Sequence, residues 1–125
     1  MKPHEKDAAI IERILEDIET LQKRVDHFGL TKERFCNDLS FEGEIAYDAV
    51  MNPLYRIVED AVHLSDAVVS AYPECSWKEI RGFRNFIAHG YSAIDRGIAW
   101  GVIENDVPKL KRVLVAYIGA DQPTN

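Results

Sequence analysis

The stretch Ser76-Trp-Lys-Glu-Ile-Arg-Gly-Phe-Arg-Asn-Phe-Ile-Ala-His-Gly-Tyr91 holds the clearest helix signal of the chain and its main candidate for chemistry. It opens with Ser76-x-x-Glu79, a capping box in which a serine and a glutamate satisfy free amides at a helix start. Apolar residues then recur in steps of three or four, which predicts one buried helix face: Trp77, Ile80, Phe83 and Ile87. Because glycine favours the left-handed stop, the helix should end near His89 and Gly90.

Off the apolar face of this helix lie its basic and polar residues, Lys78, Arg81, Arg84 and Asn85, with His89 following in the last turn. At about 100° per residue, a continued helix places positions 84 and 89 about 140° apart around the axis. An arginine fork suits a phosphate, and an imidazole titrates near neutrality and can move a proton. A guanidinium and an imidazole beside a polar amide are the groups that phosphodiester cleavage without a metal ion needs.

The spacing alone is unspecific, since an arginine followed by a histidine five residues later is common in helices. A solvated basic face with a terminal histidine stabilised by the helix dipole explains the same pattern. On spacing alone, this structural explanation is the more common one.

The segment Arg84-Asn-Phe-Ile-Ala-His89-Gly-Tyr91 resembles the Arg, four to six residues, His, x, Tyr signature of HEPN-domain ribonucleases. The flanking sequence is similar to the HepT-like toxin branch of that superfamily. Other matching segments occur in the family's order over roughly residues 11–118: Ile57-Val-Glu-Asp-Ala-Val-His-Leu-Ser65, Pro73, Trp77, Ile80, Trp100 and Pro108-Lys-Leu110. The chain departs from the family pattern at Val58, where the family has glycine, and at Asp60, where it has alanine.

The resemblance implies an all-α, up-and-down helical bundle of about five main helices that forms a homodimer. It implies that Arg84 and His89 are the catalytic pair of a composite cleft, in which the motif helices of two copies meet. His89 would act as the acid or base for attack of a ribose 2′-hydroxyl on its own phosphate, and Arg84 would stabilise the charge that develops on the phosphoryl oxygens. Asn85 would orient the imidazole or the phosphate. The expected substrate is RNA, with no DNA partner, no cofactor and no metal.

Tyr91 corresponds to a tyrosine that, in the family, a minimal nucleotidyltransferase (MntA-like) antitoxin modifies by AMPylation. Its structural alternative is an aromatic residue that packs by the loop and hydrogen-bonds through its hydroxyl. Three functions therefore stay open. The chain is a ribonuclease toxin of a toxin–antitoxin pair, a non-catalytic HEPN module that binds a nucleotide or a partner, or a plain helical dimer.

Glu59 and His63 lie four residues apart in an otherwise apolar region, so they share a helix face. One interpretation is a polar pair at the edge of the core. The other is that Glu59 supports Arg81 or Arg84 in the cleft.

Composition predicts one domain over residues 1–125, with residues 1–6 and 119–125 as frayed tails. The net charge of −6 argues against broad electrostatic binding of nucleic acid, so any RNA contact requires a local basic cleft. No run of apolar residues is long enough for a membrane span, and residues 1–7 are too polar for a signal peptide. Cys36 and Cys75 fit reduced thiols, so we expect a cytoplasmic protein.

Apolar periodicity predicts further helices over residues 7–28 and 38–71, the second of which should bend or split at Pro53. Thr31 should cap a short turn between them. Another helix should follow Asp95, and Asp106 should cap a last helix that accepts Pro108 in its first turn.

Overall fold

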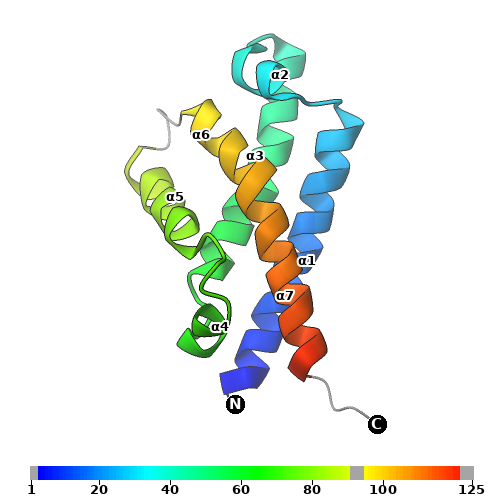
Figure 1. Cartoon of the computed structure of the whole chain (residues 1–125). Helices are drawn as coiled ribbons and strands as arrows, with labels where there is room; N and C mark the ends of the chain where they lie inside the picture. Colours follow the sequence, from blue (N-terminus) through cyan, green and yellow to red (C-terminus); the bar gives the residue numbers. More distant parts are fainter. Residues whose placement is uncertain (1–2, 91–94, 122–125) are drawn as a thin grey trace.

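The computed structural model describes residues 3–90 and 95–121, including their side chains except those of residues 3–5, 86, 88–90, 120 and 121. All regular structure in these ranges is helical, as predicted, and the chain runs up and down through a bundle (Figure 1). The longer helices are α1 (Pro3–His27), α3 (Phe41–Ala61), α5 (Trp77–Gly90) and α7 (Val107–Asp121). Shorter segments connect them: α2 (Lys32–Asn37), α4 (Asp66–Ala71), α6 (Arg96–Gly101) and the π-helical η2 (Val102–Asp106).

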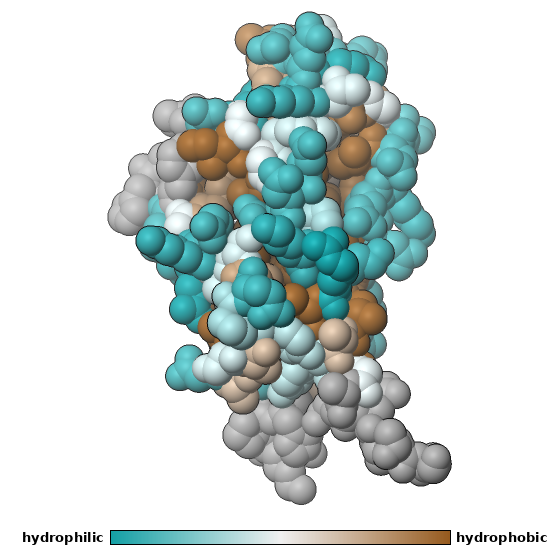
Figure 2. All heavy atoms as spheres, viewed as in Figure 1, coloured by the Kyte–Doolittle hydropathy of each residue, from teal (hydrophilic) through white to brown (hydrophobic). Residues whose placement is uncertain are grey.

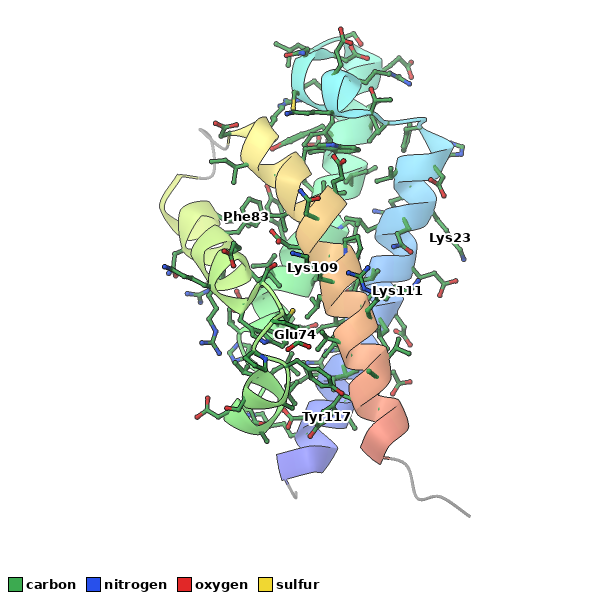
Figure 3. All side chains as sticks on the ribbon, in the orientation of Figure 1. Lys23, Glu74, Phe83, Lys109, Lys111 and Tyr117 are labelled. Atoms are coloured by element: carbon green, nitrogen blue, oxygen red, sulfur yellow. The ribbon has the colours of Figure 1, made fainter. Side chains whose placement is uncertain are left out.

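The predicted apolar faces form one core between the longer helices. α3 packs against α1 and α5, and α7 packs against α1. Phe83 points from α5 into the bundle (Figure 3), whereas the face seen in Figure 2 is largely hydrophilic with scattered apolar side chains. The largest fully buried side chains come from several helices: Ile11, Ile14, Ile18, Leu21, Phe35, Met51, Leu54, Ile57, Ile80, Leu110 and Leu114.

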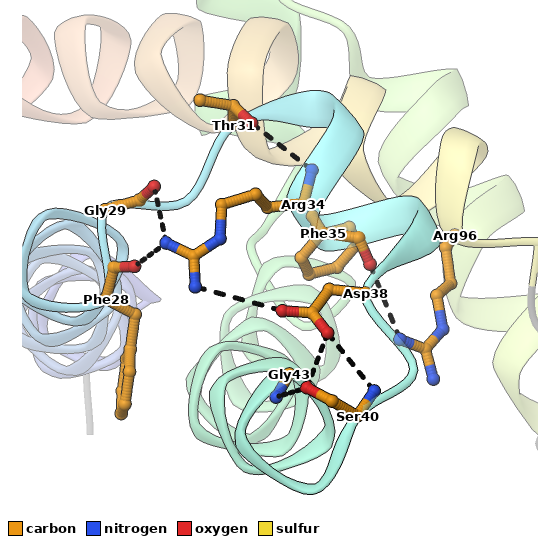
Figure 4. Close-up of polar contacts among 9 residues, drawn as sticks. All are labelled: Phe28, Gly29, Thr31, Arg34, Phe35, Asp38, Ser40, Gly43 and Arg96. Atoms are coloured by element: carbon orange, nitrogen blue, oxygen red, sulfur yellow. Dashed lines mark hydrogen bonds and ion pairs between the residues drawn. The ribbon is translucent and has the colours of Figure 1, made fainter.

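A polar network joins the end of α1 to the start of α3 (Figure 4). Arg34 of α2 donates to the Phe28 carbonyl at 2.8 Å, and its other terminal nitrogen lies 3.9 Å from Asp38. Asp38 accepts from the Ser40 hydroxyl at 2.6 Å, and Ser40 in turn caps α3 by accepting from the Gly43 amide at 3.2 Å. A Cβ at position 43 would overlap the Asp38 carbonyl, so this tight connection requires glycine.

The predicted helix over residues 38–71 is not continuous, and it is not interrupted at Pro53. α3 runs through Pro53, although proline lacks the N–H that would bond the carbonyl of Ala49 four residues earlier. The Arg24 side chain of α1 donates to that carbonyl instead, with 2.7 Å between Nη1 and the oxygen. A hydrogen bond between two helices thus replaces the one that proline removes.

The interruption lies at residues 62–65, where Asp7 of α1 binds Ser65. The Asp7 carboxylate is only 2% exposed and accepts from the Ser65 amide at 3.0 Å and from its hydroxyl at 2.6 Å. Since the Ser65 amide is bonded to Asp7, α3 loses the hydrogen bond that would continue it from Ala61. Ser65 then occupies the N-cap position of α4.

The predicted N-cap role of Asp106 is wrong, because α7 continues directly from a segment that is already helical. α6, η2 and α7 follow one another without a break, and Asp106 lies within the π-helical segment. Asp95 does cap α6, with its carboxylate accepting from the Gly97 amide at 2.8 Å. The wide turns of η2 end just before Pro108, the residue that has no amide hydrogen to donate.

Helical structure extends into both predicted tails, since α1 starts at Pro3 and α7 reaches Asp121. The helices that the structure describes are all too short or too polar to cross a bilayer. Cys36 and Cys75 are both free thiols.

Candidate active site

α5 separates apolar and polar side chains onto two sides, as its sequence predicts. Trp77, Ile80 and Phe83 are buried, and Ile87 packs half-buried against the same core. The opposite side is exposed and carries Lys78, Arg81, Arg84 and Asn85. The apolar side therefore fixes the helix to α3, and a row of cationic and amide groups remains open to ligands.

The start of α5 is attached to η2. Ser76 directly precedes the helix, and its hydroxyl hydrogen-bonds the carboxylate of Asp106. Burial raises the pKa of Asp106, and the nearby carboxylate of Glu79 acts in the same direction, whereas the Ser76 hydrogen bond opposes both. The surroundings of Asp106 thus disfavour its charged form, and the hydrogen bond from Ser76 at the start of α5 partly offsets this effect.

Glu59 of α3 links Arg84 and His63. The Arg84 Nε atom donates to Glu59 Oε2 at 3.2 Å, and His63 Nε2 lies 3.6 Å from Glu59 Oε1. The hydrogen bond from Arg84 lowers the pKa of Glu59, with a smaller contribution from His63. Both sequence interpretations of Glu59 thus correspond to a contact. Glu59 pairs with His63, in the turn that follows α3, and with Arg84 of α5 rather than with Arg81.

A groove of about 400 Å³ lies between α3 and α5 beside this pair. Its walls combine two guanidinium groups with apolar and aromatic side chains. The lining residues are Tyr55, Arg56, Val58, Glu59, Arg84 and Ile87. The groove thus gathers two guanidinium groups, each paired with one carboxylate and each partly exposed, on a chain whose net charge is −6.

Arg56 enters the groove from α3. Its Nε donates to Asp17 of α1 at 3.0 Å, and its Nη1 donates to Asn52 at 3.2 Å. Its side chain remains 48% exposed, close to the 44% of Arg84. Both arginines are therefore oriented by one or two hydrogen bonds and are still accessible to a ligand.

The other predicted site residues are placed less completely. Within the described part of the chain, Arg81 and Asn85 are exposed and make no hydrogen bond or ion pair. α5 continues through position 89 and ends at Gly90, as predicted, but the His89 side chain lies outside the described residues. Tyr91 also lies outside them. The structure thus brings Glu59 and Arg84 together and leaves the positions of the imidazole and of the motif tyrosine open.

No group of three or more His, Cys, Asp and Glu side chains that could hold a metal ion occurs in the ranges that the structure describes. The donor set of the groove, two guanidinium groups and one carboxylate that is already paired, suits an anionic ligand with several acceptor oxygens.

Sequence reasoning missed Arg56. A signal was present, because Arg56 stands three residues before Glu59 and so lies on the same exposed edge of an apolar helix. The sequence does not show that α5 packs beside this edge of α3, and this packing makes the edge one wall of a groove.

Comparison with known proteins adds a family to this geometry. The family model described as Ribonuclease HepT-like matches residues 10–117. The chain is 32% identical to the protein named "Putative RNase MJ1380" of Methanocaldococcus jannaschii over 92 residues, which are 74% of this chain and 84% of that protein. It is 27% identical to "Probable ribonuclease HepT" of Thermococcus cleftensis over 97 residues, or 78% of this chain and 86% of that protein.

A third relative is longer. The chain is 30% identical over 111 residues to "Gamma-glutamylcyclotransferase and putative RNase MJ0434" of Methanocaldococcus jannaschii, a match that covers 88% of this chain and 47% of that protein. No solved structure matches the chain with significance.

Proposed function

The chain belongs to the HepT-like ribonuclease family, and on this premise we propose that it cleaves RNA through Arg84 and His89 without a metal ion. The observation that carries the proposal is the setting of Arg84. Its guanidinium lies half-exposed at a groove, and among the described residues it bonds only to Glu59, through Nε, so both terminal nitrogens can bind a phosphate. The names of the relatives, which include ribonucleases, support RNA as the substrate.

In the proposed reaction, the 2′-oxygen of a ribose attacks the adjacent phosphorus. A bond from phosphorus to the 2′-oxygen forms and the bond to the 5′-oxygen of the next nucleotide breaks, which leaves a 2′,3′-cyclic phosphate and a free 5′-hydroxyl. An imidazole of His89 accepts the 2′-hydroxyl proton or protonates the leaving 5′-oxygen. Arg84 stabilises the charge on the phosphoryl oxygens, and Asn85 orients the imidazole or the phosphate.

We place this site between two copies of the chain. α5 stays helical through Gly90, so its positions 84 and 89 differ by about 140° around the helix axis. Within one copy, these two positions therefore lie on different sides of the helix. Two α5 helices that meet in a homodimer allow the guanidinium of one copy to face the imidazole of the other.

We further propose that the chain is the toxin of a toxin–antitoxin pair, silenced when a minimal nucleotidyltransferase (MntA-like) antitoxin transfers AMP to Tyr91. The added phosphate would carry negative charge close to the catalytic residues and compete with RNA for Arg84. Protein co-expressed with this antitoxin should gain the mass of one or more AMP units. An unmodified mass in a fully neutralised complex would reject this route of regulation.

The test of the catalytic assignment is cleavage of a labelled single-stranded RNA by His89→Ala. We expect the variant to lose cleavage while remaining a dimer, and we expect the wild type to keep its activity in excess EDTA. His27→Ala is the matched control, because His27 is an exposed histidine at the end of α1, far along the chain from the motif.

Equal cleavage by His89→Ala and the wild type, in preparations free of contaminating nuclease, would end the assignment. Loss of wild-type activity in EDTA that added metal restores would contradict the metal-independent reaction. RNA or ATP binding without any cleavage would identify the non-catalytic HEPN module instead.

A further inference from the structure

The groove between α3 and α5 contains a second cation that the proposed reaction does not use. Arg56 and Arg84 line it from opposite helices, and each side chain is nearly half-exposed. Arg56 donates from Nε to Asp17 and from Nη1 to Asn52, while its Nη2 makes no hydrogen bond within the described residues. An arginine has five N–H donors, so Arg56 is oriented by its neighbours and still has donors to offer.

Arg56 and Arg84 line the same groove, together with Glu59. Arg56 and Glu59 are one helical turn apart on α3, which puts their Cβ atoms about 5–6 Å from each other. Glu59 in turn lies 3.2 Å from the Arg84 Nε. Both arginines are therefore neighbours of the same glutamate on the wall of one groove.

Apart from Glu59, which pairs with Arg84, the rest of the groove lining is apolar or aromatic. Val58 is buried, and Ile87 and Tyr55 are half-buried. An aromatic and aliphatic surface flanked by cations is the combination on which unpaired nucleotides bind, because a base or ribose packs on the apolar part and the phosphates reach the cations.

We propose that Arg56 is a phosphate-binding residue for the nucleotide next to the scissile phosphate, so that the α3–α5 groove takes at least two consecutive phosphates of single-stranded RNA. This inference rests on the proposed ribonuclease function and extends it to a binding residue outside the Arg84–His89 motif. Arg56 acts on substrate affinity, because it binds a phosphate that does not react.

The chain provides a matched control for Arg56. Arg13 of α1 forms an ion pair with Asp60 of α3 at 3.3 Å, just as Arg56 of α3 pairs with Asp17 of α1 at 3.0 Å. Arg13 is similarly exposed, at 55%, but it does not line the groove. Arg13→Gln therefore removes the same charge and the same kind of α1–α3 pair as Arg56→Gln.

The experiment measures cleavage kinetics and RNA binding for Arg56→Gln, Arg13→Gln and Asp17→Asn, with binding measured in a His89→Ala background to prevent turnover. Arg56→Gln should raise KM and Kd about five- to tenfold and leave kcat within about twofold. It should also reduce the slope of log Kd against log salt by about 0.7, the value for one lost phosphate contact on a single strand. Arg13→Gln should leave KM, Kd and the salt slope unchanged.

Asp17→Asn distinguishes phosphate binding from helix packing. It breaks the same ion pair as Arg56→Gln but keeps the cation, so it should leave Kd unchanged or lower it. An increase in Kd equal to that of Arg56→Gln would overturn the proposal, because Arg56 would then act by holding α3 against α1. Equal KM and Kd for Arg56→Gln and Arg13→Gln would overturn it as well.

The two proposals fail in different ways. Wild-type protein that binds RNA through Arg56 without cleaving it would retain the phosphate position and reject the ribonuclease assignment. Wild-type protein that cleaves RNA with no dependence on Arg56 would do the reverse. Wild-type protein that neither binds nor cleaves RNA would reject both.

Discussion

At the scale of single residues, Asp106 is the side chain whose charge least suits its surroundings. Burial raises its pKa above the ordinary value of 3.8. A carboxylate with a raised folded-state pKa binds protons more readily in the folded than in the unfolded chain, so stability falls as pH rises through that folded pKa. Above it, the charged form of Asp106 opposes folding.

We therefore predict that Asp106→Asn stabilises the protein at about pH 7, by about 0.5 kcal/mol or less because Asp106 is only partly buried. The amide oxygen can still accept the Ser76 hydrogen bond. The advantage should disappear below the unfolded-state value of 3.8, where aspartate is itself neutral. Urea unfolding at about pH 7 and about pH 3 measures the stability difference between variant and wild type at each pH. An equal increase in stability at the two pH values would show that charge is not the cause.

Single-residue contacts were predictable where they repeat a local pattern and not where they join distant positions. The Thr31 cap and the pairing of Glu59 with His63 follow from spacings of three and four residues. The bonds of Asp7 to Ser65 join positions 58 apart, and no local pattern marks them. The contact of Glu59 with Arg84 is intermediate, because the sequence offered Arg81 and Arg84 equally and only the seating of α5 on α3 selects one.

At the scale of elements, the uninterrupted course of α3 through Pro53 depends on a donor from α1. The Ala49 carbonyl receives its hydrogen bond from Arg24 rather than from its own helix. Sequence rules treat proline as a break because they consider only one helix at a time. A second helix that supplies the missing donor lies beyond such rules, which is why the prediction misplaced the interruption by about ten residues.

This arrangement predicts a coupling between Arg24 and Pro53. Arg24→Met should destabilise the protein by about 1–3 kcal/mol, because the Ala49 carbonyl loses its partner. In a Pro53→Ala background the loss should be smaller by about 1 kcal/mol, because an alanine at that position supplies an amide hydrogen to the same carbonyl. Urea unfolding of the four proteins gives the coupling energy, and an identical loss in both backgrounds would contradict the account.

At the scale of the whole molecule, the sequence predicts the helical bundle but not how two copies of the chain pack together. Every long helix follows an apolar spacing of three or four residues, so the core residues could be predicted without knowledge of tertiary contacts. The proposed active site is different, because a continued α5 places positions 84 and 89 on different sides of the helix. Periodicity within one chain cannot show how two copies of that helix meet.

Subunit mixing tests the shared site. Arg84→Ala and His89→Ala should each be inactive as homodimers, but co-expression forms mixed dimers in which an intact Arg84 and an intact His89 meet across the interface. We expect part of the cleavage activity to return in the mixed dimer, purified with two different tags. Inactive mixed dimers of verified composition would mean that both groups of a site come from one chain.

The π-helical segment η2 has a consequence for how this chain tolerates changes in length. The Val107 amide bonds to the Val102 carbonyl five residues back, so the segment holds a surplus residue relative to an α-helical path. The extra residue rotates the side chains of α6 by about 100° around the helix axis relative to those of α7. Trp100 can then stack near Phe35 while α7 keeps Leu110 and Leu114 in the core. A deletion of one residue here would turn α6 by about 100° relative to α7 and move Trp100 away from Phe35.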